Sequence, residues 1–513
     1  MDLLLNWILR GIILGVGVGA AAAIVFWMRH VWRSSPERWT VRLAGGMIVL
    51  VAVYTVAHVR LLAQRDYIEA GRKAYAIYGD PRRTEMRRGE VRGWILDCSG
   101  EDERALAYYR ESDDVIDRVY ALGQAGANLL GGGDGAEERD YTIEVLLASR
   151  LRAPRSILDL ERLHPVGKDL RVTLCRDVTS EAYRRLAQDG RPGAVIVQDV
   201  RTGALVAYAA TGGADDPPLG IKHYSPPGSV FKLALAAVWY EQGLPDDITI
   251  ACPAEIRVSS RATIANYGHE AGEDVVGPTG MLIPSCNTAA VWMALHMREQ
   301  IGSEPFIEAY ERFGFTPYED APPVDSIADF WQTDSDAWAD RMSPPPSRIR
   351  ISANTGTDEW AQLAIGQGPL DVTVVGVSRF IQGIANDGVM LSPRFEFDQI
   401  GDGRGTRIMS NETAQRLQRD MRLVVERGTG GAAGRPVAET GWTMGGKTGT
   451  AQVAGRSDNG WFAGILFGPD GEPRYTIVSF LEGGGPGGGA PAAIAGQVAR
   501  ELTGLEFDFG EGR

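Results

Sequence analysis

The sequence predicts an α+β fold, in which helices are segregated from an antiparallel sheet. Near the C-terminus, three strand-like segments at 445–453, 461–467 and 475–481 are separated by Asp-Asn-Gly and Pro-Asp-Gly turns. Earlier in the chain, two apolar segments joined by Arg201-Thr202-Gly203 have the pattern of a β-hairpin. Longer apolar stretches predict helices at 230–241, 289–299, 372–384, 411–425 and 492–502.

Composition and charge place the chain among ordinary folded proteins. Its 513 residues are 44% hydrophobic and 23% charged, which is typical of globular rather than disordered sequences. Because single hydrophobic cores stop growing at roughly 250–300 residues, this length favours more than one folded unit. The formal net charge of -14 argues against nucleic acid as a partner, since phosphate binding needs a basic surface.

The cysteine and histidine positions do not form a metal-binding pattern. The chain has no Cys-x-x-Cys pair and its six histidines are scattered, so we expect neither a metal nor another cofactor. Cys252 and Cys286 could pair if the domain lies in an oxidising compartment. The alternative is that all four cysteines, Cys98, Cys175, Cys252 and Cys286, are buried thiols.

Two apolar segments near the N-terminus are predicted to cross a membrane. Residues 11–28 are uncharged and have the length that a spanning helix needs, about 17–25 residues. A cleaved signal peptide is the rival interpretation, but its apolar core runs only about 7–15 residues. Here the run continues past Ala20–Ala23. Residues 43–58 are interpreted as a second, shorter span, with one span plus an interfacial helix as the alternative.

The charges between these two segments predict their orientation. The linker carries four arginines and one acidic residue, Glu37, so the positive-inside rule places it in the cytoplasm and the residues after 60 on the outer face. We therefore predict three parts: a membrane hairpin over 1–60, a charge-rich stalk or small pedestal over 61–165, and the main α+β domain over 166–506.

A serine and a lysine three positions apart open one of the predicted helices. Pro226-Pro227-Gly228 breaks the chain before Ser229, and Lys232 shares a helical face with that serine. A serine becomes a good nucleophile when a base takes its proton, and a neutral lysine can be that base. Burial and nearby positive charge lower a lysine's pKa from about 10.4. Alone, the pair is more often a helix cap with a solvated lysine.

Two further motifs change this interpretation. Ser285-Cys286-Asn287 precedes a predicted helix, where alone it would be an ordinary cap. Lys447-Thr448-Gly449-Thr450 lies on a predicted strand, where alone it would be an edge strand blunted by its lysine. In this order, Ser-x-x-Lys, Ser-x-Asn and Lys-Thr-Gly are the motif set of penicillin-binding proteins and serine β-lactamases.

With these motifs, the chain resembles the class B penicillin-binding proteins, the monofunctional D,D-transpeptidases of peptidoglycan synthesis. The resemblance is good over 166–503 and patchier over 90–165. The family usually has one membrane span where two are predicted here, and the predicted pedestal is short. Segments that are similar to the family, in family order, are 91–100, 199–207, 224–232, 364–368, 427–430, 446–452 and 461–464.

The resemblance implies a penicillin-binding transpeptidase fold and a seryl acyl-enzyme. Ser229 would attack the bond between the two terminal D-alanines of a stem peptide, with Lys232 as general base. Ser285 and Asn287 would relay the leaving-group proton and hold the substrate amide, and Lys447 would attract the substrate carboxylate. The substrate-binding residues would be Thr448, Gly449 and Thr450, and the backbone N–H groups of Ser229 and Thr450 would form the oxyanion hole.

The resemblance also implies partners and a location. Peptidoglycan stem peptides would be the substrates and β-lactams the inhibitors. A polytopic membrane glycan polymerase would be the partner, because about a hundred residues before position 166 leave no room for a glycosyltransferase domain. The chain would lie in the bacterial cytoplasmic membrane with its catalytic domain outside the cytoplasm. Lysine or diaminopimelate as acceptor, and a role in division, elongation or sporulation, remain open.

Two other functions fit the motifs less well. A class A β-lactamase would carry a Glu-x-x-Leu-Asn stretch for its deacylating water, and none follows Asn287. A β-lactam receptor or an inactive regulatory scaffold is the other alternative. A receptor would need a sizeable cytoplasmic module, and the linker over 29–42 is too short for one.

Overall fold

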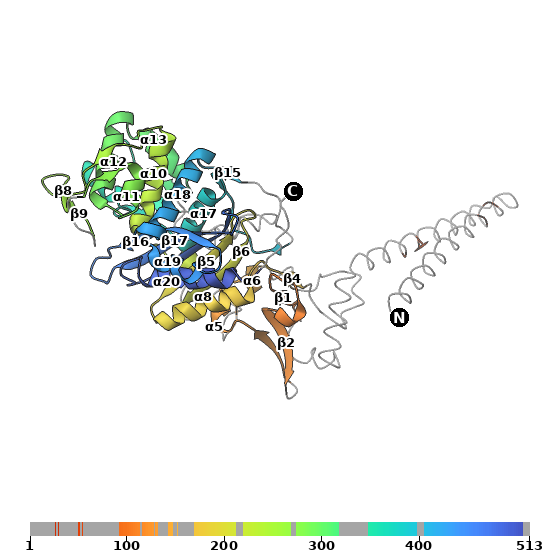
Figure 1. Ribbon diagram of the computed structural model, residues 1–513. Coiled ribbons are helices and arrows are strands. Elements are labelled where there is room, and N and C mark those ends of the chain that lie inside the picture. The colour runs from red at the N-terminus through yellow and green to blue at the C-terminus, as the bar shows by residue number, and fades with distance from the viewer. Residues whose placement is uncertain are drawn as a thin grey trace. The chain divides into compact units, whose positions relative to one another are not determined.

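The computed structural model describes residues 92–112, 115–127, 129–131, 142–146, 151, 169–211, 219–267, 273–317, 347–397 and 405–505, with single helical positions at 26, 29, 50, 51 and 54 (Figure 1). The chain forms two compact units, residues 1–91 with 155–168 and residues 92–154 with 169–513. Every element named below belongs to the second. None of the helices described is long and apolar enough to cross a membrane. Apart from some of the single positions, the spans predicted at 11–28 and 43–58 lie outside the described residues.

A five-stranded antiparallel sheet is the largest sheet of this unit (Figure 1). The last strand of the C-terminal meander pairs with the first strand of the early hairpin, with Tyr475 opposite Asp199 and Leu481 opposite Gly193. In spatial order the strands are β16 (Thr443–Ala451), β17 (Asn459–Phe467), β18 (Pro473–Leu481), β5 (Gly193–Asp199) and β6 (Leu205–Thr211).

Alternating side chains of these strands build a core on each face of the sheet. Ile196 of β5 belongs to the larger core and its neighbour Val197 to the smaller one, as the two-residue period of a strand requires. The helix α17 (Val374–Ala385) packs on the first face. The helices α8 (Arg176–Asp189) and α20 (Ala490–Leu502) pack on the second.

Several helices that lie between β6 and β16 in the chain, α10 among them, form the other half of the domain. In α10 (Lys232–Glu241) every residue from Lys232 to Tyr240 is buried, which is the pattern of a core helix. The long helix α18 (Asn411–Arg427) packs against both α10 and β16, so it connects this half to the sheet. The remaining helices are α9 (Leu219–Lys222), α11 (Gly277–Leu282), α12 (Asn287–Ile301), α13 (Glu304–Arg312), α16 (Thr357–Ala364) and α19 (Gly431–Gly434).

Short strands join these helices in small antiparallel or mixed sheets. One hairpin, in which Ile256 pairs with Ile264, lies close to α12. The short strands are β7 (Thr249–Ile250), β8 (Glu255–Arg257), β9 (Thr263–Ala265), β10 (Val275–Val276), β11 (Phe315–Pro317), β12 (Ser347–Ile349), β13 (Leu370–Asp371), β14 (Val389–Met390) and β15 (Thr406–Arg407).

A four-stranded sheet is built mainly from residues that precede α8. In spatial order its strands are β3 (Val115–Tyr120), β2 (Ala107–Ser112), β1 (Ile95–Leu96) and β4 (Leu170–Arg171). The strand β4 pairs in parallel with β1, although it comes after the boundary predicted at 165. Two short helices, α5 (Gln124–Ala127) and α6 (Ile143–Leu146), belong to the same stretch, and α5 packs against α8.

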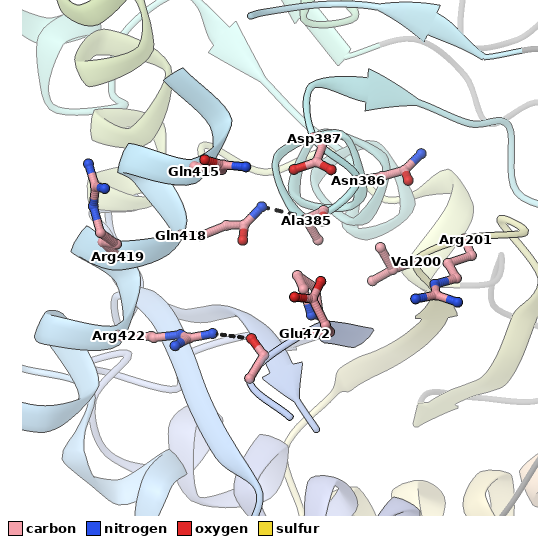
Figure 2. A pocket seen from close by; sticks show the side chains of 12 residues that line it. Val200, Arg201, Ala385, Asn386, Asp387, Gln415, Gln418, Arg419, Arg422 and Glu472 are labelled. Carbon is pink, nitrogen blue, oxygen red and sulfur yellow. Dashed lines mark hydrogen bonds between the residues drawn. The ribbon is translucent and has the colours of Figure 1, made fainter. Parts of the chain in front are cut away.

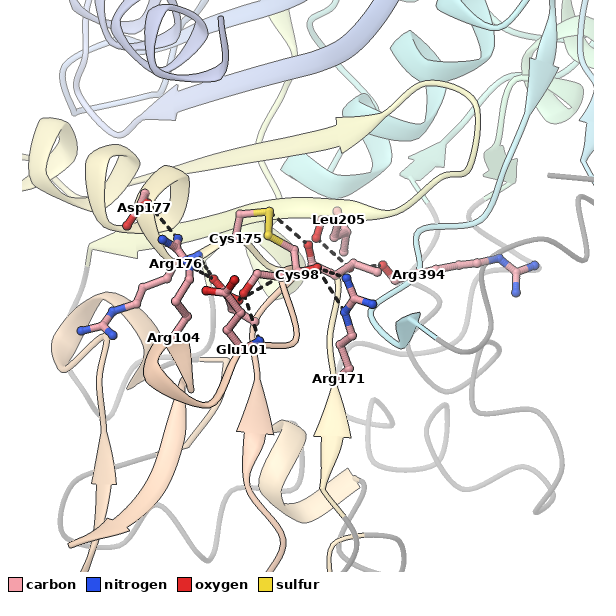
Figure 3. The surroundings of a disulfide bond; sticks show 12 residues. Cys98, Glu101, Arg104, Arg171, Cys175, Arg176, Asp177, Leu205 and Arg394 are labelled. Carbon is pink, nitrogen blue, oxygen red and sulfur yellow. Dashed lines mark hydrogen bonds and ion pairs between the residues drawn. A yellow bond between two sulfur atoms is a disulfide. The ribbon is translucent and has the colours of Figure 1, made fainter. Parts of the chain in front are cut away.

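A disulfide joins this small sheet to the main domain. Cys98 follows β1 and Cys175 precedes α8, and their Cα atoms are 5.0 Å apart (Figure 3). Arg104 forms ion pairs with buried Asp97 at 3.1 Å and with Asp177 of α8 at 2.8 Å. The end of β1 and the first turn of α8 are therefore held together by charge as well as by a covalent bond.

The α+β class, the early hairpin, the C-terminal meander and the five predicted helices are confirmed, with bounds that differ by a few residues. The alternative that all four cysteines are thiols is wrong. Cys252 and Cys286 form a disulfide with Cα atoms 6.4 Å apart, as the other alternative held. The Cys98–Cys175 pair was not predicted. Its partners lie 77 positions apart, and no local pattern marks them.

Candidate active site

Ser229 lies on a 3₁₀ turn, η3 (Gly228–Phe231), that leads directly into α10. Gly228 has a φ of +53°, and a Cβ there would lie 2.3 Å from the backbone oxygen of Thr450. Glycine is the residue that tolerates both this left-handed conformation and so close an approach. The Gly228 N–H also donates to the carbonyl of Gly366 at 2.9 Å. The glycine thus packs η3 against β16 and sets the place of the half-buried Ser229.

Lys232, at the start of α10, is completely buried but well hydrogen-bonded. Its Nζ donates to the backbone oxygen of Ser285 at 2.6 Å and to the amide oxygen of Asn287 at 2.7 Å. The hydroxyl oxygen of Ser285 lies 3.3 Å away. An ammonium group has three donors, so these three oxygens match its capacity.

The backbone of Ser285 makes these contacts possible. Its φ is +62°, in the left-handed region that non-glycine residues rarely adopt and that costs roughly 1–3 kcal/mol. This conformation turns both its carbonyl and its hydroxyl oxygen to Lys232. Asn287 then begins α12, and its Nδ2 donates to the carbonyl of Ala265 at 2.9 Å. That bond leaves the amide oxygen of Asn287 facing Lys232.

Lys447 reaches the same serine from the edge strand β16. Its Nζ donates to the hydroxyl oxygen of Ser285 at 2.8 Å and to the backbone oxygen of Thr448 at 3.0 Å. The hydroxyl of Ser285 therefore lies between two amino groups. The alternative of a lysine that only blunts a sheet edge is wrong, because the Lys447 side chain is fully buried.

Burial sets the protonation of the two lysines. Burial, and secondly the positive charge of Lys447, holds the pKa of Lys232 well below its usual value. Burial also lowers the pKa of Lys447 to about 7. Because the charge on Lys447 disfavours a second charge beside it, Lys232 is the one that is neutral while Lys447 is still cationic.

A neutral Lys232 also matches the atoms around it. A neutral amine has two N–H donors and one lone pair. The backbone oxygen of Ser285 and the amide oxygen of Asn287, the two nearest acceptors, take the two donors. The lone pair is then left to accept a proton, and the hydroxyl oxygen of Ser285 lies at the longer distance of 3.3 Å. The arrangement can act as a base toward a neighbouring hydroxyl group.

The other predicted residues of β16 lie beside η3. A Cβ on Gly449 would lie 2.6 Å from the backbone oxygen of Pro227, so this glycine allows the close packing of strand and turn. The hydroxyl groups of Thr448 and Thr429 are 2.6 Å apart and hydrogen-bonded. Thr450 is half-buried next to Gly228. Three motifs that are far apart in the sequence therefore meet at one place.

Two residues at this place were missed by the sequence analysis. Thr429 belongs to the 427–430 segment that carries part of the family resemblance, which is a signal that could have indicated it. Asn266, at the end of β9, accepts the backbone N–H of Asn287 at 2.7 Å. It lies 21 positions before its partner, and no motif surrounds it.

A separate pocket lies away from the three motifs. Figure 2 shows this open, polar pocket of about 350 Å³, and its lining contains none of the motif residues. Arg422 of α18 donates to the carbonyl of Gly471 there, and Glu472 adds the opposite charge. Its mixed charges define no single ligand chemistry, so the candidate active site is the lysine cluster.

Comparisons with known proteins show which family the chain is similar to. The family described as the penicillin binding protein transpeptidase domain matches residues 193–504. PbpB, a penicillin-binding protein of Mycobacterium tuberculosis, is 30% identical over 361 residues, which is 60% of this chain and 46% of the relative. PbpB of Mycolicibacterium smegmatis is 27% identical over 66% of this chain and 54% of the relative. The chain thus spans about half the length of these relatives.

Solved structures share the fold. The D,D-transpeptidase domain of a peptidoglycan glycosyltransferase from Eggerthella lenta matches with a TM-score of 0.63 and 23% identity, over 81% of this chain and 99% of that one. Penicillin binding protein 3 of Mycobacterium tuberculosis in complex with aztreonam matches with a TM-score of 0.60 and 24% identity, over 80% and 95%. With the family match over most of the main domain, these likenesses confirm the class B resemblance: the chain belongs to the penicillin-binding protein transpeptidase family.

Proposed function

We propose that this protein is a serine D,D-transpeptidase that cross-links the stem peptides of peptidoglycan. Ser229 attacks the carbonyl between the two terminal D-alanines of one stem, D-alanine leaves, and an acyl-enzyme ester forms. An amine of a neighbouring stem then attacks this ester, which creates the cross-link and frees Ser229. A β-lactam would acylate Ser229 because its amide takes the place of the same peptide bond.

The observation that carries the proposal is the hydrogen-bonded cluster of Lys232, Ser285, Asn287 and Lys447, one helical turn from Ser229. Two amino groups are buried there side by side, which is costly in an ordinary protein core. Strongly shifted pKa values of this kind cluster at functional sites, where they serve acid–base chemistry. The family match supports the same conclusion.

Lys232 is proposed as the general base. In its neutral form its two donors are occupied by Ser285 and Asn287, so its lone pair can accept the proton of Ser229. The Ser285 hydroxyl can then donate its own proton to the departing amine and take the proton back from Lys232. After this relay Lys232 is again neutral and Ser285 again carries its hydroxyl proton. Asn287 is proposed to hold the amide of the substrate as well.

Lys447 and the threonines of β16 are proposed to bind the substrate carboxylate. A bound carboxylate raises the pKa of Lys447 and so keeps it cationic. Thr448 and Thr450 would donate their hydroxyls to that carboxylate, and Gly449 lets the strand lie close to η3. The backbone N–H groups of Ser229 and Thr450 are the proposed oxyanion hole; losing such a donor costs roughly 2.7–4 kcal/mol.

We also propose that residues 1–60 anchor the chain in the bacterial cytoplasmic membrane, with the catalytic domain on its outer face. The arginine-rich linker supports this orientation. Two disulfides support it too, because such bonds persist mainly outside the cytoplasm. A reporter fused after Leu61 should be active only outside; activity confined to the cytoplasm would reverse the topology.

A polytopic membrane glycan polymerase is the proposed partner, contacted through residues 1–165. The family match over residues 193–504 is to the transpeptidase domain, and the class B resemblance implies that a separate protein polymerises the glycan strands. Co-purification of the full-length chain with such a protein, and its loss when residues 1–60 are deleted, is the expected result. Undiminished co-purification after the deletion would contradict contact through the predicted spans.

The central test is covalent labelling of the full-length chain by a fluorescent penicillin. Labelling should be lost in Ser229→Ala and kept in Ser225→Ala, a neighbouring serine that serves as the control. Mass spectrometry should find the adduct on the peptide that contains Ser229. Persistent labelling of a folded Ser229→Ala variant would remove Ser229 from its role. Rapid release of hydrolysed drug would favour a β-lactamase instead.

A further inference from the structure

Asn266, at the end of the β8–β9 hairpin, caps the first turn of the helix that begins with Asn287. Its Oδ1 accepts the backbone N–H of Asn287 at 2.7 Å and that of Thr288 at 3.1 Å. The first N–H groups of a helix have no partner within the helix. Here a side chain at the end of a strand far away in the sequence accepts two of these N–H groups, and it fixes the backbone of Asn287 in place.

The amide group of Asn266 is also held on its other side. Its Nδ2 donates to the backbone oxygen of Pro253 at 2.5 Å and to the hydroxyl of Thr288 at 3.1 Å. A flipped amide would direct N–H groups at the N–H groups of α12, so the orientation of the side chain is determined. The acceptors and donors of Asn266 are thus all used in tying the β8–β9 hairpin to the start of α12.

The same hairpin determines the side chain of Asn287. Ala265, the residue before Asn266, accepts the Nδ2 of Asn287 at 2.9 Å through its backbone oxygen. The amide oxygen of Asn287 is then left for the Nζ of Lys232 at 2.7 Å. Backbone and side chain of Asn287 are therefore both set by two consecutive residues at the end of β9.

A disulfide also joins the start of α12 to the chain near the β8–β9 hairpin. The Cys252–Cys286 disulfide connects the residue before Asn287 to the segment of chain that leads into β8. Asn266 Nδ2 lies 3.4 Å from the sulfur of Cys252, so the disulfide and the hydrogen bonds of Asn266 are adjacent. The disulfide limits how far Cys286 can move. The Sγ of Cys286 accepts the backbone N–H of Ala289 at 3.2 Å, whereas Asn266 accepts the two N–H groups before it, those of Asn287 and Thr288.

We infer that Asn266 is a positioning residue for acylation: it holds Asn287, and through Asn287 the amino group of Lys232, in the arrangement that takes the proton of Ser229. The inference rests on the proposed transpeptidase function. It differs from a plain capping role, because a cap alone contributes stability, whereas a positioning residue also changes the rate and pH dependence of the folded protein.

Asn266→Ala and Asn266→Asp separate these roles. Alanine removes the acceptor, so Asn287 and Lys232 lose their fixed geometry at every pH. Aspartate keeps an acceptor for both N–H groups, loses the donor to the backbone oxygen of Pro253, and adds a negative charge near Lys232. Among the described residues, the charged group that acts on Lys232 is Lys447 of β16, whereas Ser285 and Asn287 are neutral. A new anion raises the pKa of Lys232, because it favours the charged form.

The experiment measures the second-order rate constant for acylation by a fluorescent penicillin across pH, using the full-length chain without reducing agent. Asn386→Ala is the control, since Asn386 also donates its amide to a backbone oxygen, that of Val389 at 2.9 Å, in the turn after α17. Thermal unfolding of each variant gives the folded fraction, and rates are expressed per folded protein. Thus a variant that is merely less stable is not counted as slow.

Asn266→Ala is expected to be acylated about 10–100-fold more slowly than the wild type, because small misplacements of catalytic groups slow a reaction by such factors. Asn386→Ala should match the wild type. In Asn266→Asp the acid limb of the profile should move to higher pH, with the rate recovering toward wild type above it. If Asn266→Ala does not fold, the shift in the aspartate variant decides.

Wild-type rates and an unshifted profile in the Asn266 variants would overturn the inference and leave only a capping role. The inference is also overturned if the slower acylation of the variants disappears once rates are expressed per folded protein. A wild-type chain that takes no label would refute the proposed function itself, which is a distinguishable result.

Discussion

The Nζ of Lys447 lies 2.8 Å from the hydroxyl oxygen of Ser285, a residue 162 positions earlier in the chain. The Nζ of Lys232 lies 3.3 Å from the same oxygen. Two amino groups around one hydroxyl repel each other when both are charged. This repulsion couples their protonation, and a neutral Lys232 beside a cationic Lys447 is the favoured state just below pH 7.

Acylation is expected to have a bell-shaped pH dependence. The rate should fall at low pH, where Lys232 becomes protonated and can no longer act as a base. It should also fall above about pH 7 in the free protein, because Lys447 then loses the charge that attracts the substrate carboxylate. The second-order rate constant for a carboxylate-bearing β-lactam, measured across pH, checks both limbs. A rate that keeps rising well above neutral pH would contradict the role of Lys447.

Lys447→Met is expected to abolish activity while stabilising the fold. The folded-state pKa of about 7 lies below the unfolded value, so the unfolded chain binds more protons between the two. The destabilisation caused by the buried charge of Lys447 is therefore complete below pH 7, and it decreases as the pH rises toward the pKa of this lysine in the unfolded chain. An apolar side chain should thus increase the free energy of unfolding by roughly 1–4 kcal/mol at acidic pH, and by less at alkaline pH. Denaturant titrations at both pH values measure this; destabilisation at acidic pH would refute it.

Gly228→Ala should reduce acylation, and Gly243→Ala should not. Both glycines have a positive φ, +53° and +63°, so alanine is strained by about 1–2 kcal/mol at either position. At Gly243 a Cβ would meet nothing within 4 Å, whereas at Gly228 it would collide with the backbone of Thr450. Only Gly228→Ala must separate η3 from β16. We expect at least a 10-fold slower acylation of the folded variant; equal rates for the two variants would mean that this close approach does not position Ser229.

Loss of the Cys98–Cys175 disulfide should lower stability without slowing the chemistry. The bond closes a loop of 77 positions, and removing such a bond typically costs about 2–5 kcal/mol. The double variant Cys98→Ser, Cys175→Ser should therefore unfold at lower denaturant concentration. Its acylation rate per folded protein should remain that of the wild type, because the bond holds the small sheet rather than the lysine cluster. A slower rate in the folded variant would show that the small sheet acts on the site.

Much of the fold follows from local sequence patterns. The strands of the meander and the core helix α10 are marked by apolar runs with turn residues between them, and these signals need no knowledge of the tertiary structure. The motif residues were also found in this way, because each motif is a short local pattern. Asn266 and the Cys98–Cys175 pair were not, since a single polar residue or cysteine carries no information about a partner far away in the chain.

The sequence by itself determined the class of fold, the order of its elements and which serine, lysines and asparagine to examine. Only the tertiary structure decided that Lys232 and Lys447 approach one hydroxyl, that Asn266 caps α12, and that all four cysteines pair. The physical reason is the range of the interactions. Hydrophobic periodicity and turn preferences act over a few residues, whereas a hydrogen bond between side chains far apart in the chain depends on how whole elements pack.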